Sequence, residues 1–268
     1  MIIEKILVAI TFYYVKDRLN FLKTVCSQIP NLGFRYKVFI ITNTHKESEI
    51  ELINQNIQCL SNYEIVKHLP MGHPYFLPWG HLPIFKQQFI LDPSISHFMY
   101  LEDDIEITPK NITYWLRGRN ELLEFGLYPS FLRIEKNSLN NNFYATDITS
   151  PLKIRKLPKI KISSDYYFLS LPQPYQGMYL MDREMLKEYL QSPASSPDFG
   201  SWGIREKATQ ALTFINIPDT FFSRNLLGYR SCINRVDTDA LIRHLPDNYA
   251  NDPKSQFGKV LVDELIRI

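Results

Sequence analysis

Three consecutive carboxylates, Glu102, Asp103 and Asp104, follow directly on the apolar run of residues 97–101. A short run of large apolar side chains is typical of a strand that is buried on both faces. Adjacent carboxylates repel one another and are costly to desolvate, so such a cluster favours a bound cation. Open α/β sheets bind ligands at the carboxyl ends of their strands, and hard oxygen ligands suit Mg²⁺ or Mn²⁺. The cluster is therefore a candidate divalent-metal site.

A simpler interpretation makes the three acids a turn that leads into a helix beginning at Thr108 and Pro109. Thr is a common N-cap residue, and Pro is favoured at the first helical position. Acids stabilise the positive end of a helix only within its first turn, and residues 102–104 lie upstream of that turn. The spacing therefore favours the metal site over a helix-capping role.

The composition of the 268-residue chain is that of a globular protein. Hydrophobic residues make up 45% and charged residues 22%, and both values are ordinary. The sequence has only 10 glycines and contains neither a G-x-G-x-x-G motif nor a P-loop, which argues against a glycine-rich phosphate cradle. The net charge of +2 gives no electrostatic reason to expect nucleic acid as a partner.

A basic run at residues 153–161 departs locally from this even charge balance. A solvated loop or edge strand is its first interpretation. The second is a contact with an acidic acceptor or a peripheral contact with a membrane surface. No stretch approaches the roughly 20 apolar residues of a membrane span, and three widely spaced cysteines indicate a reducing compartment. We therefore expect a cytoplasmic protein without a transmembrane segment.

The elements that must position the acids begin with a β-α-β pattern. Strands are predicted at residues 6–11 and 36–42, and helices at residues 16–28 and 48–56. This alternation implies parallel strands joined by right-handed crossovers. The later predicted elements are an irregular loop at 70–83, helices at 82–91, 112–125, 184–190 and 204–214, strands at 131–135, 166–171 and 175–181, and a terminal helix.

Four separated features, taken in chain order, resemble the GT-A-type glycosyltransferases that use nucleotide sugars. They are the β-α-β start, the acidic cluster, the stretch 197–206 (PDFGSWGIRE) and the late stretch 243–246 (RHLP). The layout is most similar to the exostosin-like branch of that superfamily. The resemblance implies a three-layer α/β/α fold with a mostly parallel central sheet, Rossmann-like in its first half. With no repeat or linker, we predict one domain, with a nucleotide-sugar-binding half at 1–108 and a mixed acceptor-side half at 109–268.

In that family an acidic DxD motif ends a central strand, where its last acid binds the metal and its first contacts the ribose or sugar. The resemblance therefore implies Asp104 as a metal ligand, Glu102 as a ribose or water-mediated contact, and Asp103 as a contact to the ribose or donor sugar. Because Glu102 stands where the family has Asp, Asp103 is an alternative first acid. Many members complete the metal site with a late histidine, which implies His244 as a ligand and Arg243 as a diphosphate contact. A packing role for His244 is the alternative.

The resemblance also implies a catalytic acid near Trp202 and Gly203, where the family deprotonates the acceptor hydroxyl or stabilises the sugar cation. Glu206 and Asp198 are the two candidates, and Glu206 aligns better with the Trp-Gly pair. An acid such as Glu206 in the first turn of a helix is also favoured by the helix dipole alone. Asp198, which follows a proline, would equally suit an ordinary turn.

Contacts to the nucleotide and the donor sugar are implied near the ends of several strands. The family binds base and ribose just after its first strand, places a basic residue near the start of the next helix, and passes a small residue beneath the donor sugar. The matching positions are Thr11, Phe12, Tyr13, Arg18, Asn43, Gln176 and Gly177. Arg18 would equally suit a solvated helix face, and a bulge would also explain Gly177.

The resemblance implies a metal-dependent glycosyltransferase with a UDP-sugar as donor, Mn²⁺ or Mg²⁺ as cofactor and a hydroxyl of a glycan or glycoconjugate as acceptor. A divalent metal that bridges a diphosphate neutralises the charge of the leaving group. A metal-dependent nucleotidyl or phosphoryl transferase would place acids at the same strand end, but it typically has a basic or glycine-rich loop after its first strand, and residues 11–16 are aromatic instead. A catalytically silent carbohydrate-binding protein on the same fold is the other alternative.

Overall fold

The computed structural model describes residues 2–68 and 72–267, which form two compact units. Residues 2–105 and 177–212 make up the first, here called the parallel-sheet unit. Residues 106–176 and 213–267 make up the second, here called the mixed-sheet unit. The chain leaves the parallel-sheet unit near the expected boundary between the halves and then returns to it for residues 177–212.

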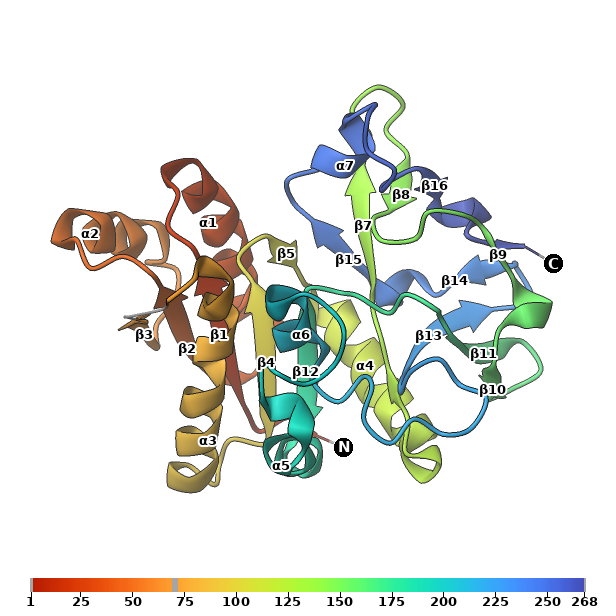
Figure 1. Ribbon diagram of the computed structural model, residues 1–268, viewed down its shortest axis with the longest axis horizontal. Helices are drawn as coiled ribbons and strands as arrows, with labels where there is room; N and C mark the ends of the chain where they lie inside the picture. Colours follow the sequence, from red (N-terminus) through yellow and green to blue (C-terminus); the bar gives the residue numbers. More distant parts are fainter. Residues whose placement is uncertain (1, 69–71, 268) are drawn as a thin grey trace. The chain divides into compact units, whose positions relative to one another are not determined.

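The parallel-sheet unit is built on a five-stranded sheet in the order β12-β4-β1-β2-β3 (Figure 1). The strands β1 (Lys5–Phe12), β2 (Arg35–Thr42), β3 (Tyr63–Lys67) and β4 (His97–Glu102) are mutually parallel. The fifth strand, β12 (Met178–Asp182), runs antiparallel to β4. The central strands β1 and β4 are almost entirely buried, which is why they read as continuous apolar runs rather than as alternating ones.

Helices cover both faces of this sheet. Each crossover is right-handed, so the face on which its helix lies depends on the side of the sheet to which the next parallel strand is added. From β1 to β3 the chain moves outward in one direction, and α1 (Leu19–Gln28) and α2 (Glu47–Asn56) pack against each other. α3 (His81–Leu91) leads back across the sheet to β4, so it lies on the opposite face, where it contacts α5 (Arg183–Gln191). The predicted α/β class with a mostly parallel central sheet is confirmed.

Short elements complete the parallel-sheet unit. The loop expected around residues 70–83 contains the 3-10 helix η3 (Pro74–Gly80), against which α6 (Ile204–Gln210) packs, while residues 69–71 lie outside the described residues. The indole nitrogen of Trp79 donates to the carbonyl of Ile204 over 2.9 Å. The remaining short elements are the 3-10 helices η1 (Lys16–Arg18), η2 (Pro30–Leu32) and η6 (Pro193–Ser195).

The mixed-sheet unit contains small sheets in which most strand pairs are antiparallel and some are parallel. One has the order β10-β11-β13-β14, with β6 beside β13, and another contains β16-β8-β7-β15, in which β7 and β15 are parallel. β17 pairs with β9. The strands are β6 (Tyr128–Pro129), β7 (Leu132–Lys136), β8 (Phe143–Ala145), β9 (Leu152–Lys153), β10 (Lys159–Lys161), β11 (Tyr166–Ser170), β13 (Asn225–Arg230), β14 (Arg235–Val236), β15 (Leu241–His244), β16 (Val260–Leu261) and β17 (Ile266–Arg267).

The principal helix of this unit, α4 (Pro109–Leu122), lies three residues nearer the N-terminus than the predicted range 112–125. Thr108 is its N-cap, and the backbone N–H of Thr108 donates to Oδ1 of Asn111 over 2.7 Å. The amide of Asn111 donates in turn to the carbonyls of Asp239 and Leu241, each over 2.8 Å. These bonds tie the start of α4 to the segment that enters β15.

The predicted terminal helix is wrong. Residues 248–267 instead hold the four-residue helix α7 (Asn248–Asn251), the strands β16 and β17, and the 3-10 helix η8 (Val262–Glu264). The buried side chains of Leu265 and Ile266 pack as part of the β9 and β17 pairing. Pairing with a strand distant in the sequence therefore overrides the local helical pattern of this segment.

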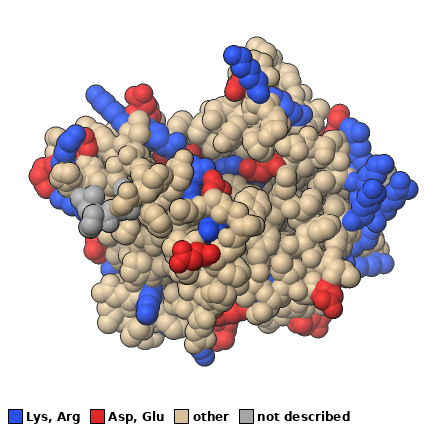
Figure 2. All heavy atoms as spheres, in the orientation of Figure 1, with Lys and Arg blue, Asp and Glu red and all other residues tan. Residues whose placement is uncertain are grey.

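The basic run lies on β9, β10 and η5 (Ile154–Lys156), where Figure 2 shows Lys and Arg side chains gathered. Its cationic residues are all exposed, and they are Lys153, Arg155, Lys156, Lys159 and Lys161. The exposure of these cationic side chains agrees with a solvated edge, although Leu157 within the run is buried. Among residues 2–68 and 72–267, no helix combines the length and the apolar character that crossing a bilayer requires.

Candidate functional site

The carboxyl ends of β1, β2 and β4 meet at one edge of the parallel sheet. The register fixes this, because Thr11 pairs with both Ile41 and Glu102. The antiparallel strand β12 starts at the same edge, since Met178 pairs with Leu101. The segments that follow β1, β2 and β4, and the one that precedes β12, therefore converge there, as expected for a ligand-binding edge of an open α/β sheet.

Asp103 and Asp104 lie at this edge and share one cation, Arg18. The Arg18 guanidinium donates to both carboxylate oxygens of Asp103, over 3.0 Å from Nε and 2.7 Å from Nη2. The same Nη2 donates to Oδ2 of Asp104 over 2.8 Å. Both aspartates are only 5% exposed. The structure thus brings together three of the predicted site residues, although Arg18 and the acids lie 85 residues apart in the chain.

The charges at this site are not balanced by Arg18 alone. Burial, followed by the negative charge of Asp104, raises the pKa of Asp103 to about 7, and Arg18 only partly offsets these effects. Burial opposes the charge of Arg18, but the bonds to Asp103 and the charges of the two acids outweigh it and raise the pKa of the guanidinium above its ordinary value. Two buried carboxylates beside one guanidinium leave an excess of negative charge that a further cation would neutralise.

The stability of the metal-free protein is expected to fall as the pH rises from about 4 to about 7. An exposed Asp has a pKa near 3.9, whereas that of Asp103 in the folded chain is about 7. Over this window the folded chain holds a proton that the unfolded chain has released, so the free energy of unfolding decreases with pH, by up to about 4 kcal/mol. Urea unfolding in EDTA at a series of pH values measures the effect.

The variant Asp103→Asn provides the comparison for this pH series. It loses the carboxylate at every pH, so its stability should lack the decrease between pH 4 and 7 that Asp103 contributes. The difference between the two slopes isolates this one group from the other titrating residues. Parallel curves for the wild type and Asp103→Asn would contradict the raised pKa.

Glu102 lies against Gly177 at the start of β12. The backbone N–H of Glu102 donates to the carbonyl of Gly177 over 3.1 Å. Gly177 has a positive φ of 65°, and a Cβ there would lie 2.9 Å from Oε2 of Glu102 and 3.2 Å from Cγ1 of Ile105. Only glycine combines this backbone conformation with so close an approach. The structure therefore brings these two predicted donor-site residues together.

Thr11 and Phe12 end β1 inside the core of the unit. The hydroxyls of Thr11 and Tyr100 are hydrogen bonded over 2.7 Å, and Thr11 is only 6% exposed. The ring of Phe12 is completely buried. The side chains of these two predicted donor contacts serve packing in this structure, so a contact to a nucleotide would have to come from their backbone.

The loop that follows β1 is held by Asn43, which follows β2. Oδ1 of Asn43 accepts a hydrogen bond from the backbone N–H of Tyr14 over 2.7 Å. Tyr13, the residue before it, is 43% exposed. Of the three positions implied after the first strand, Tyr13 thus presents an aromatic ring to solvent, and Asn43 shapes the loop that carries it.

The two candidate catalytic acids differ in their surroundings. Glu206 lies in the first turn of α6 and pairs with Arg205 over 3.2 Å. A Cβ on Gly203, the N-cap residue of that helix, would clash with Oε2 of Glu206 at 2.2 Å, so the Glu206 carboxylate folds back over the start of the helix. Asp198 is exposed on the preceding loop, where its backbone N–H donates to the hydroxyl of Ser196 over 3.3 Å.

Gln176 and Arg243 belong to the mixed-sheet unit, and both have partners within it. Oε1 of Gln176 accepts a hydrogen bond from the backbone N–H of Phe131 over 2.8 Å, and Gln176 is only 6% exposed. Arg243 forms a bidentate pair with Asp247, in which the Nη2 to Oδ2 distance is 2.8 Å. The two side chains of this pair are about one quarter exposed.

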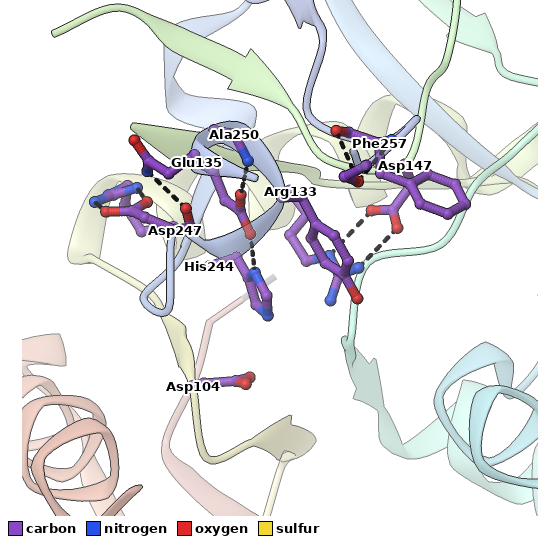
Figure 3. Close-up of polar contacts among 12 residues, drawn as sticks. Asp104, Arg133, Glu135, Asp147, His244, Asp247, Ala250 and Phe257 are labelled. Carbon is purple, nitrogen blue, oxygen red and sulfur yellow. Dashed lines mark hydrogen bonds and ion pairs between the residues drawn. The ribbon is translucent and has the colours of Figure 1, made fainter. Parts of the chain in front are cut away.

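His244 ends β15 and contacts a buried carboxylate that sequence reasoning missed. Its Nδ1 is hydrogen bonded to Oε1 of Glu135, on the neighbouring strand β7, and the other carboxylate oxygen accepts from the backbone N–H of Ala250 over 2.6 Å (Figure 3). Glu135 is completely buried, and His244 is 6% exposed. In residues 131–135 the polar side chains of Arg133 and Glu135 alternate with apolar ones, a pattern that indicates a solvent-facing side and so hides the burial of Glu135.

The donor chemistry of the acidic edge fits a hard divalent cation. Within residues 2–68 and 72–267, no three or more His, Cys, Asp or Glu side chains gather closely enough to form a complete metal site. Mg²⁺ and similar ions usually bind through one or two carboxylates, with substrate phosphates and waters supplying the remaining ligands. The Asp103 and Asp104 pair, with its excess of negative charge, suits that arrangement. Asp104 and His244 belong to different units, so their joint binding of one ion stays a prediction.

The fold and the acidic edge define the class as an α/β protein with a three-layer, mostly parallel unit and a mixed-sheet unit. No family model matches the chain, and no curated protein matches it. It is similar in structure to S. aureus TarS, with a TM-score of 0.40 and 12% identity over 69% of this chain and 29% of that chain. For TarS 1-349 the TM-score is again 0.40 at 12% identity, over 69% of this chain and 48% of that chain.

A third similar structure is that of a glycosyltransferase involved in the glycosylation of the major capsid of PBCV-1. Its TM-score is 0.36 at 12% identity, over 80% of this chain and 78% of that chain. The present chain thus spans less than half of the length of either TarS chain.

Proposed function

We propose that this chain is a metal-dependent glycosyltransferase of the GT-A type. Its donor would be a nucleoside-diphosphate sugar, in the first instance a UDP-sugar, and its acceptor a hydroxyl of a glycan or glycoconjugate. The observation that carries the proposal is the buried Asp103 and Asp104 pair at the carboxyl edge of the parallel sheet, with more negative charge than Arg18 balances. A bare acidic pair would repel a diphosphate, whereas a pair that binds a divalent cation would attract one.

The proposed metal ligands are Asp104 and His244, and the ion is Mn²⁺ or Mg²⁺. Carboxylate oxygens suit Mn²⁺ and Mg²⁺, and histidine is a common metal ligand through its neutral imidazole. When bound, the ion would neutralise the charge that develops on the departing diphosphate.

Other residues of this chain would position the donor sugar nucleotide around the bound ion. Glu102 or Asp103 would accept hydrogen bonds from the ribose or the sugar, and Glu102 lies beside Gly177, which precedes β12. The exposed ring of Tyr13 offers a surface on which a nucleobase can stack. The guanidinium of Arg243, held in place by Asp247, would contact the diphosphate.

On the acceptor side a carboxylate would take the proton of the attacking hydroxyl or stabilise the developing sugar cation. Glu206 is the first candidate, because it lies in the Trp-Gly segment that the family resemblance marks. Its carboxylate lies beside the guanidinium of Arg205, at 3.2 Å. Asp198, on the loop before it, is the second candidate.

Glu206→Gln is expected to lower the kcat of sugar transfer by about 100-fold or more, because general bases of this kind contribute factors of that size. The KM for the donor should change little, since the donor is bound by other residues. Asp198→Asn is the matched variant, an acid-to-amide change on the loop before α6, and it should leave kcat within a few-fold of the wild type. Initial-rate kinetics with donor and acceptor varied separately measure both. The reverse pattern would assign the role to Asp198.

Turnover of a panel of UDP-sugars by the purified protein tests the proposal as a whole. We expect release of UDP from one donor when Mn²⁺ or Mg²⁺ is present and none when EDTA is added. Release of pyrophosphate from a nucleoside triphosphate would instead indicate a nucleotidyl transferase. Glycan binding without turnover of any donor would indicate a silent carbohydrate-binding protein. Neither binding nor turnover of any nucleotide sugar would overturn the proposal.

A further inference from the structure

The side chains of Glu135 and His244 form a buried pair inside the mixed-sheet unit. The parallel register of β7 and β15 creates it, because Ile134 pairs with Arg243 and the next residues on each strand lie side by side. Glu135 is completely buried and His244 is only 6% exposed. A carboxylate in such a place is costly unless hydrogen bonds satisfy it, and here both of its oxygens have a hydrogen-bond partner.

The ring of His244 is fixed from two directions. Nδ1 is bound by Oε1 of Glu135, and the ring of Tyr249 stacks on the imidazole with centroids 5.6 Å apart and planes inclined by 15°. The other carboxylate oxygen of Glu135 is fixed by the backbone N–H of Ala250 over 2.6 Å. Figure 3 shows Glu135 between His244 and Ala250. Neither the carboxylate nor the imidazole can turn without losing a buried contact.

We propose that Glu135 is a positioning residue that holds His244 as the tautomer with its proton on Nδ1. Carboxylate oxygens accept hydrogen bonds, and Oε2 of Glu135 already accepts from the backbone N–H of Ala250, so we assign the proton of the contact with Oε1 to Nδ1. The lone pair of the neutral ring then lies on Nε2, which is the atom that would bind a divalent cation. Carboxylates fix metal-binding histidines elsewhere in this way, and they also raise the basicity of the ligand. The inference deepens the proposed function and rests on it for the identity of the bound cation.

The isosteric variant Glu135→Gln separates this role from simple packing. The backbone N–H of Ala250 can only donate, so the amide oxygen of the glutamine must face it. The amide NH₂ then faces Nδ1 of His244, which must become the acceptor, and the proton moves to Nε2. The shape of the core is kept while the ring presents an N–H, instead of a lone pair, to any cation.

Long-range ¹H–¹⁵N correlation spectra of the histidine rings at pH 8 test the tautomer directly, without metal or donor. The signals of His244 are identified by their absence in His244→Asn. We expect a protonated Nδ1 in the wild type and a protonated Nε2 in Glu135→Gln. A protonated Nε2 or an imidazolium in the wild type would overturn the inference, and so would an unchanged tautomer in a folded Glu135→Gln. The wild-type spectrum alone shows whether Nδ1 of His244 is protonated, so the inference can be tested even if Glu135→Gln fails to fold.

Binding of Mn²⁺, followed by electron paramagnetic resonance, is the second measurement. Glu135→Gln should bind Mn²⁺ about 10- to 100-fold more weakly than the wild type, as is typical when the partner of a metal-binding histidine is lost. Glu124→Gln, which removes an exposed acid of the same unit, is the control and should bind Mn²⁺ normally. A switched tautomer with unchanged Mn²⁺ affinity would overturn the metal-binding role of Nε2. Failure of the proposed function would show separately, as absence of donor turnover in a wild type whose tautomer is as expected.

Discussion

Asp104→Asn is expected to lower Mn²⁺-supported turnover of the donor about 1,000-fold and to abolish Mn²⁺-supported donor binding. The amide has lost the charge that attracts a hard cation, and a thousand-fold loss corresponds to about 4 kcal/mol of transition-state stabilisation, within the range attributed to a catalytic metal ion. Donor binding is measured by calorimetry with and without Mn²⁺, and turnover by release of UDP.

Asp92→Asn is the matched control for this variant. Asp92 is also a partly buried aspartate of the parallel-sheet unit and pairs with Lys5 over 2.6 Å, but it precedes β4 instead of following it. It should keep Mn²⁺-supported donor binding. If Asp104→Asn binds the donor with Mn²⁺ as tightly as the wild type does, Asp104 is not the metal ligand.

Asp104→Asn should also reduce the loss of stability that the metal-free protein undergoes as the pH rises. Asp104 contributes the like charge that, after burial, raises the pKa of Asp103. Without it the pKa of Asp103 falls towards its ordinary value, and less stability is lost between pH 4 and 7. This effect on the metal-free protein distinguishes a loss of charge at the edge from general misfolding.

Arg18→Ala is expected to lower the free energy of unfolding at pH 8 by about 3 kcal/mol in the absence of metal. Arg18 is the cation seen on both buried aspartates, and removal of one partner of a buried ion pair typically costs 3–5 kcal/mol. The lower end applies because one third of the Arg18 side chain is exposed. Mn²⁺ should recover much of this loss, because it would replace the missing positive charge beside Asp103 and Asp104.

Urea unfolding with and without Mn²⁺ measures both parts of this expectation. Arg35→Ala removes an exposed arginine at the start of β2 and should change stability by less than about 0.5 kcal/mol. The stabilisation by Mn²⁺ should be larger in Arg18→Ala than in the wild type or in Arg35→Ala. Equal stabilisation of all three proteins would show that the aspartate pair does not hold the cation.

The elements of the parallel-sheet unit were predictable because their sequence signals are local. β1, β4 and the second part of β2 are buried on both faces, so each is a continuous apolar run. The helices α1 and α3 fall within a few residues of the predicted ranges. The short strands of the mixed-sheet unit carry no such signal. β15, β16 and β17 depend on partners far along the chain, which is why β15 passed unrecognised and a terminal helix was expected where β16 and β17 lie.

In the candidate site, too, some features could be predicted from the local sequence and others depend on the tertiary structure. The three acids stand out because charge follows directly on a buried strand, and Gly177 stands out by residue type alone. The pairing of Arg18 with Asp103 and Asp104 depends on the register of β1 against β4. The burial of Phe12 depends equally on what packs around the end of β1. The Arg18 pairing and the burial of Phe12 both depend on residues distant in the chain, so the apolar and polar pattern of a local segment does not predict them.

By itself, the sequence determined the α/β class and the position of an acidic cluster at the end of a central strand. Both follow from apolar periodicity, which reports burial of an element along its own length. Only the tertiary structure decided that Arg18 neutralises part of that cluster and that Glu135 fixes His244 across two parallel strands. The alternation of residues 131–135 marks Glu135 as solvent-facing, whereas packing in the folded chain buries it completely. The physical reason is that strand register and packing determine which charged side chains meet, and the segments that carry Arg18 and Asp103, or Glu135 and His244, are more than 80 residues apart in the chain.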